Sequence, residues 1–552
     1  MKVSDLIVKC LENEGVRYVF GVPGEENEDL LFSLESSSIK FIPTRHEQGA
    51  AFMADVWGRL TGRAGVCLST LGPGATNLVT GVADAYLDKS PVVAITGQAG
   101  LGRIQRESHQ YIDAITMFRP ITKWNGSISD PDVAAEMVRK AFKVAESEKP
   151  GATHLELPED IAKMQTDRKP LPSIRVRRPD PDRKALADAA ALIAGARKPL
   201  IIAGNGAIRK LASSQLRELV KKCHLPVVNT FMGQGAIADS SPESLFTLGL
   251  GLRDFVMDAV DQADLIMTVG YDLTEYAPQR WNPKPERRII HIDFTPAEVY
   301  TNYQPSVELV ADISATLREL NALIGSRACA FDPAWYAPIR QRIIDDVASY
   351  DLKDGQPFTV PGVLNILRSV MADEDLLISD VGAHKIWIAR NFPVNYPNGC
   401  LISNGLASMG FALPGAVAAA LQNPQRRIVA AMGDGGFLMN SQELETAKRL
   451  GVGFTVIVFN DNDYGLISWK QQTARGHTTG THLTNPNFKQ YAESFGIKGY
   501  QPRTLSELQQ QLREAIMSKQ LCVVEIPVDQ RVNYELVKKL DPAQRTGIAH
   551  GD

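Results

Sequence analysis

Cysteine and histidine are scarce in this sequence, and neither residue forms a cluster. The cysteines are spread over the whole chain, and no CxxC or Cys/His pattern predicts a zinc site or a redox pair. The six cysteines are Cys10, Cys67, Cys223, Cys329, Cys400 and Cys522. Buried thiols in a reducing compartment are the simpler interpretation, so we expect a cytoplasmic protein.

Long apolar runs and an excess of charge of one sign are also lacking. The formal net charge is -4, from 59 basic and 63 acidic residues spread along the chain, so nucleic acid and anionic membranes are not expected partners. No stretch approaches the roughly 20 apolar residues that span a bilayer. The first residues, MKVSDLIVKCLENEGV, include Lys9, Glu12 and Glu14 and are typical of an amphipathic helix rather than a secretory signal.

The sequence does contain a regular alternation of short apolar runs and longer helical patterns. The runs AGVCLST (64–70), PVVAIT (91–96) and THLELP (153–158) are rich in strand-forming residues, and segments such as HEQGAAFMADVWGRLTG (46–62) are typical of helices. This alternation predicts α/β domains in which helices flank parallel sheets. The length of 552 residues is too great for a single hydrophobic core.

Two interruptions divide the alternation into three parts. The polar, Pro- and Arg-rich stretch TDRKPLPSIRVRRPDPDRK (166–184) is typical of an exposed linker. A less regular helical stretch follows at 332–358, before the strand pattern resumes with EDLLISD (374–380). We therefore predict three doubly wound parallel-sheet domains, at residues 1–165, 185–330 and 358–540.

The middle domain contains a glycine turn with two interpretations. Gly204, Asn205 and Gly206 follow a predicted strand, and glycines in this position let a phosphate approach the backbone. The third glycine of the dinucleotide fingerprint is missing, so an ordinary strand-to-helix turn is favoured.

A second glycine turn predicts a phosphate and metal site in the third domain. A strand, RIVAAM, leads into GDGG, where Gly433, Gly435 and Gly436 leave backbone N–H groups free to face a diphosphate, with Asp434 beside them. A helix and a second strand follow, and that strand ends in NDND (460–463). Alone, GDGG is often a tight turn and NDND an exposed loop. Together, at adjacent strand ends, their oxygen atoms suit Mg²⁺ that bridges phosphates.

This arrangement resembles the diphosphate and metal motif of thiamine-diphosphate enzymes. Asp461 lies 27 residues after Asp434, a spacing similar to that of acetolactate synthases. The segment PTRHEQGAAFMADVWGRLTGRAGVCLSTLGPGATN (43–77) resembles the pyrimidine-binding segment of the same family along its whole length. The resemblance covers nearly the whole chain and implies pyrimidine-binding, central dinucleotide-fold-like and diphosphate-binding domains.

The resemblance implies roles for individual residues. Mg²⁺ would be bound by the side chains of Asp434 and Asp461 and by the backbone carbonyl of Asp463. Glu47 would hydrogen-bond the aminopyrimidine ring of the cofactor and activate it. Without the resemblance, Glu47 would be an ordinary first-turn glutamate favoured by the helix dipole.

Other segments resemble site-lining segments of the same family. ISNGLASMGFALPGA (402–416) would place Met409 under the bend of the cofactor and the Ala407 carbonyl near its pyrimidine amine, although alone Met409 would be core filler. In ESHQYIDAITMFRPITKWN (107–125), His109, Gln110 and Lys123 match catalytic-site positions, although His109 and Gln110 alone would indicate a solvated loop. The predicted cofactor contacts are completed by Gly24, His384, Gly433, Gly435, Gly436 and Tyr464.

One residue departs from the family pattern. The GVPG turn of the family is present at 21–24, but Glu25 occupies a position that is Gly or Ala in relatives. Its carboxylate either alters substrate choice or points into solvent.

The resemblance also narrows the reaction. Simple decarboxylases of this family commonly use a pair of adjacent histidines, and no two histidines are adjacent in this sequence. Glyoxylate carboligases lack the activating glutamate, so the presence of Glu47 argues against that assignment. The segments GYDLTEYAPQRWN (270–282) and NYQPSVELVADI (302–313) resemble FAD-independent, catabolic acetolactate synthases. We expect thiamine diphosphate and Mg²⁺ as cofactors, with FAD not required, and two pyruvates joined into 2-acetolactate for a branched-chain amino acid or acetoin pathway.

Alternatives and partners complete the expectation. The alternative functions are another thiamine-diphosphate 2-oxo acid decarboxylase or carboligase, and a flavin-linked pyruvate oxidase. A non-catalytic relative would have lost the activating or metal residues, but Glu47, Asp434 and Asp461 are all present. In this family the cofactor lies between the first domain of one subunit and the third domain of another, so a dimer is the minimum active unit and a tetramer is expected.

Overall fold

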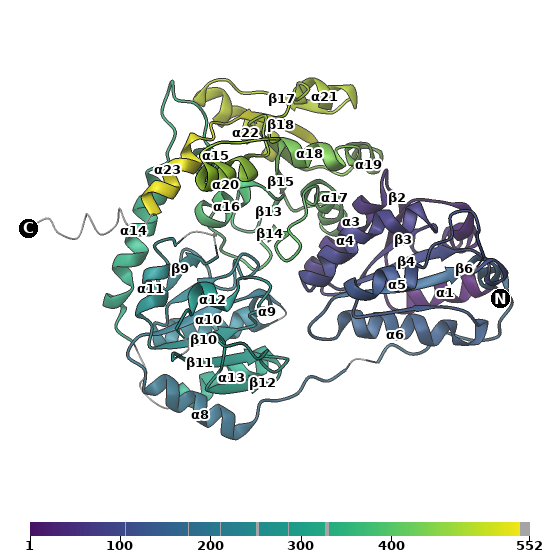
Figure 1. Ribbon diagram of the computed structural model, residues 1–552, viewed down its shortest axis with the longest axis horizontal. Coiled ribbons are helices and arrows are strands. Elements are labelled where there is room, and N and C mark those ends of the chain that lie inside the picture. Colours follow the sequence, from purple (N-terminus) through teal and green to yellow (C-terminus); the bar gives the residue numbers. More distant parts are fainter. Residues whose placement is uncertain are drawn as a thin grey trace, which may run out of the picture.

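The computed structural model describes residues 1–104, 106–174, 176–209, 211–249, 253–284, 286–325 and 331–540. These residues form three six-stranded sheets in which every pair of neighbouring strands is parallel. Helices cover the faces of each sheet (Figure 1). The predicted fold class, α/β with three doubly wound parallel sheets, is confirmed.

The first sheet has the strand order β2-β1-β3-β4-β6-β5. Its strands are β1 (Tyr18–Gly21), β2 (Lys40–Pro43), β3 (Gly65–Ser69), β4 (Val92–Gln98), β5 (Trp124–Ser127) and β6 (Ala152–Pro158). The helices are α1 (Val3–Asn13), α2 (Glu28–Glu35), α3 (Glu47–Thr61), α4 (Pro73–Leu87), α5 (Ala114–Phe118), α6 (Ala134–Glu146) and α7 (Glu159–Lys163). The predicted strands at 64–70, 91–96 and 153–158 correspond to β3, β4 and β6.

An extended segment without helix or strand, which Figure 1 shows along the lower edge of the molecule, leads to the second sheet. That sheet has the order β12-β11-β10-β7-β8-β9. Its strands are β7 (Pro199–Ala203), β8 (Val227–Asn229), β9 (Ser244–Thr247), β10 (Leu265–Val269), β11 (Arg288–Asp293) and β12 (Val307–Val310). The helices are α8 (Arg183–Ala194), α9 (Asn205–Ile208), α10 (Ala212–Cys223), α11 (Met257–Gln262), α12 (Pro278–Trp281), α13 (Ile313–Gly325) and α14 (Ala337–Ala348).

The third sheet has the order β14-β13-β15-β16-β18-β17. Its strands are β13 (Leu376–Ser379), β14 (Cys400–Ile402), β15 (Ile428–Gly433), β16 (Thr455–Asn460), β17 (Lys498–Tyr500) and β18 (Cys522–Pro527). The helices are α15 (Val360–Val370), α16 (Ala383–Asn391), α17 (Ala412–Gln422), α18 (Asp434–Asn440), α19 (Glu443–Leu450), α20 (Gly465–Arg475), α21 (Phe488–Ser494), α22 (Leu505–Ser518) and α23 (Arg531–Leu540).

Each sheet has one position where the chain order reverses. In the first sheet it lies between β1 and β3, in the second between β7 and β10, and in the third between β13 and β15. Ligands of doubly wound sheets bind outside the carboxyl ends of the strands at such positions. The predicted Gly24 follows β1, the Gly204 turn follows β7, and Asp434 follows β15, so all three glycine turns lie at these reversal points.

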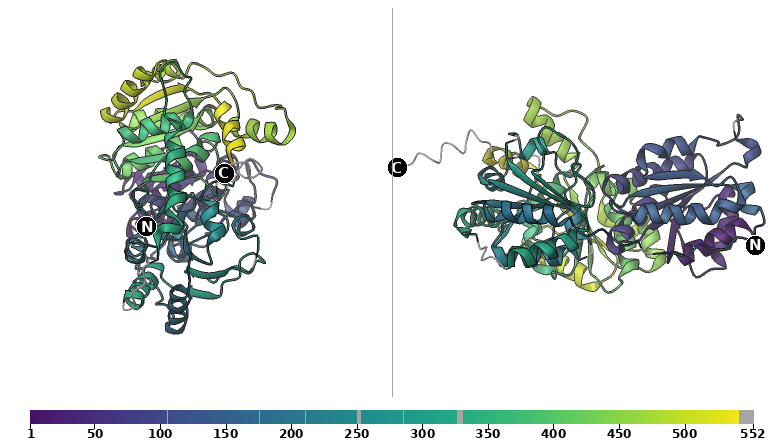
Figure 2. Two further views of the ribbon diagram at one scale, coloured as in Figure 1. Left: turned by 90° about the vertical axis from the view of Figure 1, so that its left-hand side faces the viewer. Right: turned by 90° about the horizontal axis from the view of Figure 1, so that it is seen from below.

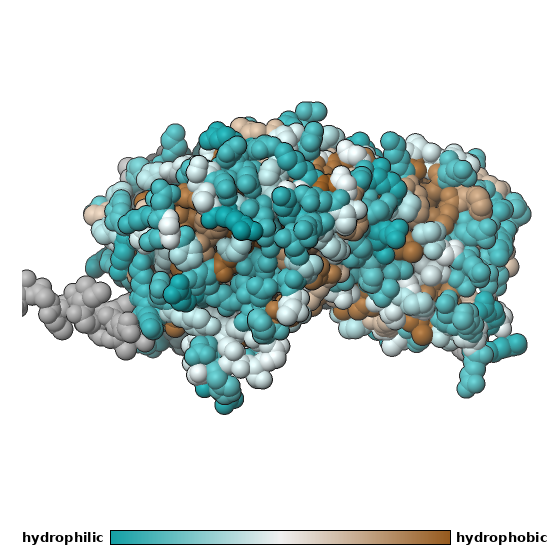
Figure 3. Space-filling view, turned by 90° about the horizontal axis from the view of Figure 1, so that it is seen from above, coloured by the Kyte–Doolittle hydropathy of each residue, from teal (hydrophilic) through white to brown (hydrophobic). Residues whose placement is uncertain are grey.

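The five described cysteines, Cys10, Cys67, Cys223, Cys400 and Cys522, are buried and free, as expected. Cys329 lies outside the described residues. Within the described part of the chain, no helix is both long and apolar enough to cross a membrane. The face seen in Figure 3 is largely hydrophilic, with apolar side chains reaching the surface in separate patches.

Helix α3 is the main contact of the first domain with the third. It begins after His46, whose ring nitrogen Nδ1 accepts the backbone N–H of Gln48 at 3.1 Å, and it ends at Gly62, which has a left-handed φ of 65°. The helix packs against α17 across the domain boundary. Figure 2 shows the first domain beside the rest of the chain, joined through this contact. Phe52 and Phe411 meet there edge to face with 5.5 Å between ring centroids.

We expect Phe52→Ala to destabilise the protein by about 3–5 kcal/mol, because the side chain is fully buried and the cavity left by its removal cannot be filled by water or by small shifts. Urea unfolding followed by fluorescence measures the change. Phe32→Ala is the control, since 61% of Phe32 is exposed, and it should change stability by less than about 0.5 kcal/mol. Equal effects of the two variants would contradict the observed packing of α3 on α17.

Candidate active site

Asp434 connects the ends of the two strands that carry the predicted metal ligands. Its Oδ1 accepts the backbone N–H of Gly435 at 2.8 Å, and its Oδ2 accepts the backbone N–H of Asn462 at 2.8 Å and the side-chain N–H of Asn485 at 2.6 Å. Strands β15 and β16 are neighbours, so the GDGG turn and the NDND turn meet as predicted. Asn485 was not predicted from the sequence, because no nearby motif marks it.

The carboxylates of this cluster repel one another. Burial raises the pKa of Asp461 to about 8, and the negative charges of Asp434 and Asp463 add to the effect. Burial also raises the pKa of Asp434. Close carboxylates with raised pKa values favour a bound cation. The Asp461 Oδ1 accepts the backbone N–H of Asp463 at 3.1 Å, which turns the chain between them.

The rings of Tyr464 and His384 lie beside this cluster. The ring of Tyr464 lies against Gly435, where an added Cβ would be 2.8 Å from the ring. His384, in the first turn of α16, lies beside Gly433, and its buried Nε2 has no hydrogen-bond partner among the described residues. Burial lowers the His384 pKa to about 4, so the ring is neutral near pH 7 and its free nitrogen suits a ligand at the end of β15.

The segment that was predicted to hold the bend of the cofactor forms a strained loop. Ala407 has a φ of +56°, which is costly for a residue with a Cβ and is found mainly at functional sites. Met409 is half-buried rather than part of a core. Beyond it, both carboxylate oxygens of Asp380 accept the backbone N–H of Gly410, at 2.9 and 3.0 Å. Burial raises the pKa of Asp380 to about 7, and these backbone hydrogen bonds lower it in part.

The other end of this loop is held by the first domain. The Ser403 hydroxyl donates to Asp84 at 2.7 Å, and the backbone N–H groups of Asn404 and Gly405 donate to Asp88. Both aspartates lie at the end of α4 and form ion pairs with Arg59, whose side chain is buried. The loop from Ser403 to Gly410 is therefore fixed at both ends by buried carboxylates.

Arg59 is the centre of this buried charge cluster. Its guanidinium contacts Asp55 at 2.8 Å, Asp88 at 2.6 Å and Asp84 at 3.4 Å, and it donates to the Ile402 carbonyl at 2.9 Å. Burial alone would lower the pKa of Arg59, but the aspartates outweigh it and raise the pKa. Burial and the charges of its aspartate neighbours raise the pKa of Asp84 well above its usual range. Sequence reasoning missed this cluster, because its members lie on two helices and show no motif.

Glu47 occupies the start of α3 as predicted, with its side chain buried. One carboxylate oxygen, Oε2, accepts the side-chain N–H of Asn77 at 2.9 Å, and Gly74 lies beside the other oxygen. The neighbouring turn after β1 is equally tight, because an added Cβ on Gly24 would lie 2.5 Å from the Thr70 Cβ. The LGPGATN segment thus supplies both the neighbour and the hydrogen-bond donor of Glu47.

The remaining predicted residues lie in three different surroundings. His109 and Gln110 are exposed, and the Gln110 backbone lies against Gly72, close to the LGPGATN segment. Lys123 lies elsewhere: its ammonium group donates to the carbonyls of Val144 and Ser147 at 2.6 and 2.7 Å and holds the end of α6. Its catalytic role stays a prediction. Glu25 is exposed, in a short 3₁₀ turn.

The glycine turn of the central domain is filled by the chain itself. The Glu275 carboxylate accepts the backbone N–H of Asn205 at 3.0 Å and a hydrogen bond from the Thr230 hydroxyl. An added Cβ on Gly206 would lie 2.5 Å from the Gly270 Cα, so the two turns at this reversal point are in direct contact. Burial raises the pKa of Glu275 to about 7. The favoured interpretation, an ordinary strand-to-helix turn, agrees with this packing.

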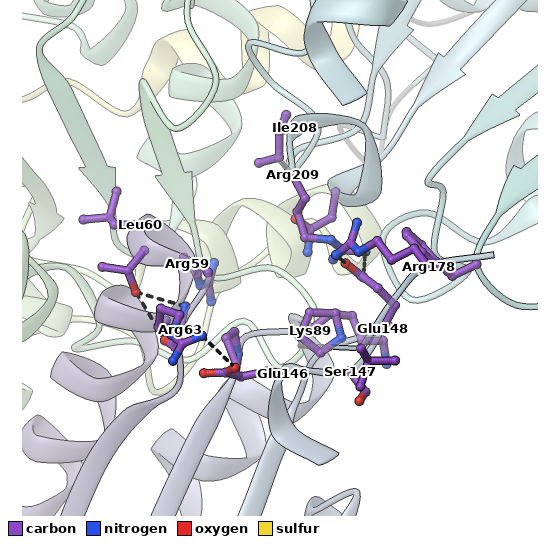
Figure 4. Close-up of a pocket in the computed structure, with 18 of the residues that line it drawn as sticks. Arg59, Leu60, Arg63, Lys89, Glu146, Ser147, Glu148, Arg178, Ile208 and Arg209 are labelled. Carbon is purple, nitrogen blue, oxygen red and sulfur yellow. Dashed lines mark hydrogen bonds and ion pairs between the residues drawn. The ribbon is translucent and has the colours of Figure 1, made fainter. Parts of the chain in front are cut away.

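A separate cavity of about 1480 Å³ lies where the linker and all three domains meet. Figure 4 shows its charged lining, in which Arg178 and Arg209 both reach Glu148 and Arg63 reaches Glu146. Of the described residues, none that was predicted as a site residue lines this cavity. Glu47, Asp434 and Asp461 therefore lie at strand ends of the first and third sheets and not in this cavity.

The donor set fits the cofactors that the sequence predicts. Among the described residues, no group of three or more His, Cys, Asp or Glu side chains could hold a metal ion. The predicted set needs only two carboxylates, from Asp434 and Asp461, together with the carbonyl of Asp463. The unpartnered nitrogen of His384 and the tight glycine turn beside it suit a diphosphate.

Comparisons with known proteins agree along the whole chain. Models of the thiamine pyrophosphate enzymes match the N-terminal TPP binding domain at residues 1–117, the central domain at 186–320 and the C-terminal TPP binding domain at 380–526. The catabolic acetolactate synthase of Raoultella terrigena is 38% identical, over 98% of this chain and 97% of that protein. The acetolactate synthase of Bacillus subtilis (strain 168) is 33% identical, over 98% of this chain and 95% of that protein.

A probable acetolactate synthase large subunit of Methanocaldococcus jannaschii is 34% identical, over 96% of this chain and 92% of that protein. These relatives match the chain across all three domains. The chain therefore belongs to the thiamine pyrophosphate enzyme family and, within it, is a relative of the acetolactate synthases.

Proposed function

We propose that the protein is an acetolactate synthase, which joins two pyruvates into 2-acetolactate with the loss of one CO₂, and that it uses thiamine diphosphate and Mg²⁺. The observation that carries the proposal is the pair of half-sites at the carboxyl ends of strands in the first and third sheets. One contains Glu47 beside Asn77, and the other contains Asp434 and Asp461 at adjacent strand ends. The full-length relatives with this name support the same reaction.

Each residue of the two half-sites has a defined task in this proposal. Asp434, Asp461 and the carbonyl of Asp463 hold Mg²⁺, and His384 binds the diphosphate through its free Nε2. When bound, thiamine diphosphate supplies a ring that accepts the electron pair released with CO₂. Glu47 keeps one oxygen on Asn77, so that its other oxygen can exchange a proton with the pyrimidine ring.

The loop from Ser403 to Gly410 orients the cofactor. The carbonyl of strained Ala407 and the half-buried side chain of Met409 would hold the pyrimidine end of the cofactor. The exposed His109 and Gln110, on the loop beside Gly72, are placed to line the substrate side of the first half-site.

The arrangement of α3 supports a dimer as the active unit. Gly49 faces the third domain of its own chain, because Glu443 lies against it. Glu47 is two residues away, about 200° around the helix, so its side chain leaves on the opposite side. This direction is compatible with a diphosphate site that a second chain brings to Glu47. Exposed apolar side chains around the loop and α18 suit burial in such an interface: Leu406, Leu438, Met439 and Ile467.

Glu275 supports a reaction without FAD. Its carboxylate takes the N–H group at the reversal point of the central sheet, where a dinucleotide phosphate would otherwise approach. Because this N–H group already has its acceptor, it is not available to a phosphate. The name of the Raoultella terrigena relative supports a catabolic role, and the term large subunit in the name of the Methanocaldococcus jannaschii relative supports assembly with other chains.

Incubation of the purified protein with pyruvate, thiamine diphosphate and Mg²⁺, without FAD, should yield one CO₂ for each acetolactate. Both products are measured together, and added FAD should not change the rate. Acetaldehyde with CO₂ would indicate simple decarboxylation instead. Acetate or acetyl phosphate, formed with a protein that absorbs near 450 nm, would indicate a flavin-linked oxidase and overturn the proposal.

Two variants test the metal site after removal of Mg²⁺ with EDTA. Asp461→Asn keeps an oxygen donor, so the Mg²⁺ concentration for half-maximal activity should rise by no more than about tenfold. Asp434→Ala removes a donor that also connects both strand ends, so this concentration should rise by about 100-fold or more. Thermal unfolding with and without Mg²⁺ gives an independent measure. Identical behaviour of both variants would contradict the assigned ligands.

Two inactive variants should restore each other's activity if each site takes residues from two chains. Glu47→Gln should lower kcat by about 10²–10⁴, because it removes a proton-transfer group. Co-expressed with Asp434→Ala, it forms mixed dimers that have one intact site and one doubly altered site. Random mixing then leaves about a quarter of all sites intact, and activity should return to about that fraction. No recovery in purified mixed dimers would show that each chain builds its own site.

A further inference from the structure

Glu443, the first residue of α19, carries a carboxylate that is fully buried where the third domain meets the first. Its Oε1 accepts the backbone N–H groups of Arg45 at 3.0 Å and His46 at 3.1 Å. Its Oε2 accepts the hydroxyl of Thr446 at 2.6 Å. In Figure 1, α19 accordingly lies beside β2 and the start of α3.

This carboxylate is costly to bury, so its position needs an explanation. Burial raises the pKa of Glu443 to about 7, although its hydrogen bonds with Thr446, Arg45 and His46 lower it in part. A buried carboxylate is tolerated where it satisfies donors that would otherwise be unpaired. Here the donors are two consecutive N–H groups of the turn that enters α3.

Helix α3 leaves space for the Glu443 side chain because residue 49 is a glycine and has no side chain of its own. A Cβ on Gly49 would lie 2.8 Å from Glu443 Oε1 and 3.0 Å from its Cδ. The glycine therefore lets the carboxylate reach the backbone of the preceding turn. Two features from opposite ends of the sequence, a glycine on α3 and a glutamate on α19, make one contact.

The contact lies directly before the proposed activating residue. Arg45 and His46 precede Glu47, and His46 caps α3 through its ring nitrogen. Fixing the two peptide groups before Glu47 fixes the direction in which its side chain leaves the helix. Asn77 then holds the Glu47 carboxylate from the other side of the helix start.

We propose that Glu443 is a positioning residue for Glu47: the third domain of one chain holds the turn at Arg45 and His46, so that Glu47 of that chain is aimed at a cofactor held by another chain. The inference rests on the proposed function, because it takes Glu47 as the group that activates thiamine diphosphate. It gives the contact between the first and third domains of one chain a second role, beyond joining the two domains.

The test is the rate at which the C2 proton of bound thiamine diphosphate exchanges for deuterium in the holoprotein with Mg²⁺ and no 2-oxo acid. This rate reports the action of Glu47 and is independent of the substrate. It is measured at saturating cofactor, by quenching in acid followed by NMR. The affinity for thiamine diphosphate and the thermal midpoint are recorded for each variant.

Three variants are compared with the unaltered protein and with Glu47→Gln. Glu443→Ala leaves two N–H groups without their acceptor and should slow the exchange by about tenfold or more, since small misplacements of a catalytic group are costly. Glu443→Gln keeps an oxygen for both N–H groups and should stay within about threefold of the unaltered rate. Lys448→Ala is the control on the same helix, where the ammonium group donates to the Phe495 carbonyl and not to the turn before α3, and it should not change the rate.

The outcomes separate the two proposals. If Glu47→Gln exchanges as fast as the unaltered protein, the proposed role of Glu47 fails and this inference with it. If Glu47→Gln is slow but Glu443→Ala is fast at saturating cofactor, only the positioning role is overturned, even if Glu443→Ala lowers the thermal midpoint or the cofactor affinity. A Glu443→Gln variant as slow as Glu443→Ala would also overturn it.

A second variant keeps the test decisive if Glu443→Ala does not fold. Gly49→Ala pushes the Glu443 carboxylate away from the turn while leaving every donor and acceptor in place. It should slow the exchange in the same way as Glu443→Ala. An unchanged exchange rate in folded Gly49→Ala protein would overturn the proposal.

Discussion

The buried guanidinium of Arg59 and the three aspartates around it are the interaction on which the arrangement of the domains depends. Asp55, Asp84 and Asp88 belong to the first domain, whereas the Ile402 carbonyl that Arg59 also binds belongs to the third. Removing one member of such a buried group leaves an uncompensated charge, at a cost of about 3–5 kcal/mol. The cluster therefore also binds the third domain, through the Ile402 carbonyl, the Ser403 hydroxyl and the N–H groups of Asn404 and Gly405, and so helps to fix how the two domains meet.

The interface between the first and third domains fixes both parts of the candidate site, because each domain holds a segment of the other. Asp84 and Asp88 reach from the first domain and hold the loop of the third domain that carries Ala407 and Met409. Glu443 reaches from the third domain and holds the turn of the first domain that carries Glu47. In both cases a buried carboxylate accepts backbone N–H groups, so the position of a loop is set without a ligand. A site arranged in advance in this way needs little reorganisation when its cofactor binds.

The positions of carboxylates also explain how the strand ends of the third sheet differ from those of the central sheet. At the reversal point of the third sheet, Asp434 and Asp461 face each other, and their raised pKa values favour a cation. At the reversal point of the central sheet, Glu275 takes the backbone N–H of Asn205 and closes the turn. The same topology thus carries a pair of acidic side chains at the strand ends of one domain and a turn closed by an acidic side chain in another.

The sequence by itself determined the elements and the residues at the strand ends. Strand and helix patterns follow from local periodicity, and the GDGG, NDND and LGPGATN segments contain their own glycines, acids and amides, so the fold class and the Glu47 and Asp434 half-sites could be predicted. Only the tertiary structure decided which distant groups meet them. Glu443 is 398 residues from Arg45, and Asp88 is 317 residues from Gly405. No periodicity records contacts over such separations, because a buried carboxylate on a helix looks in sequence like any exposed one.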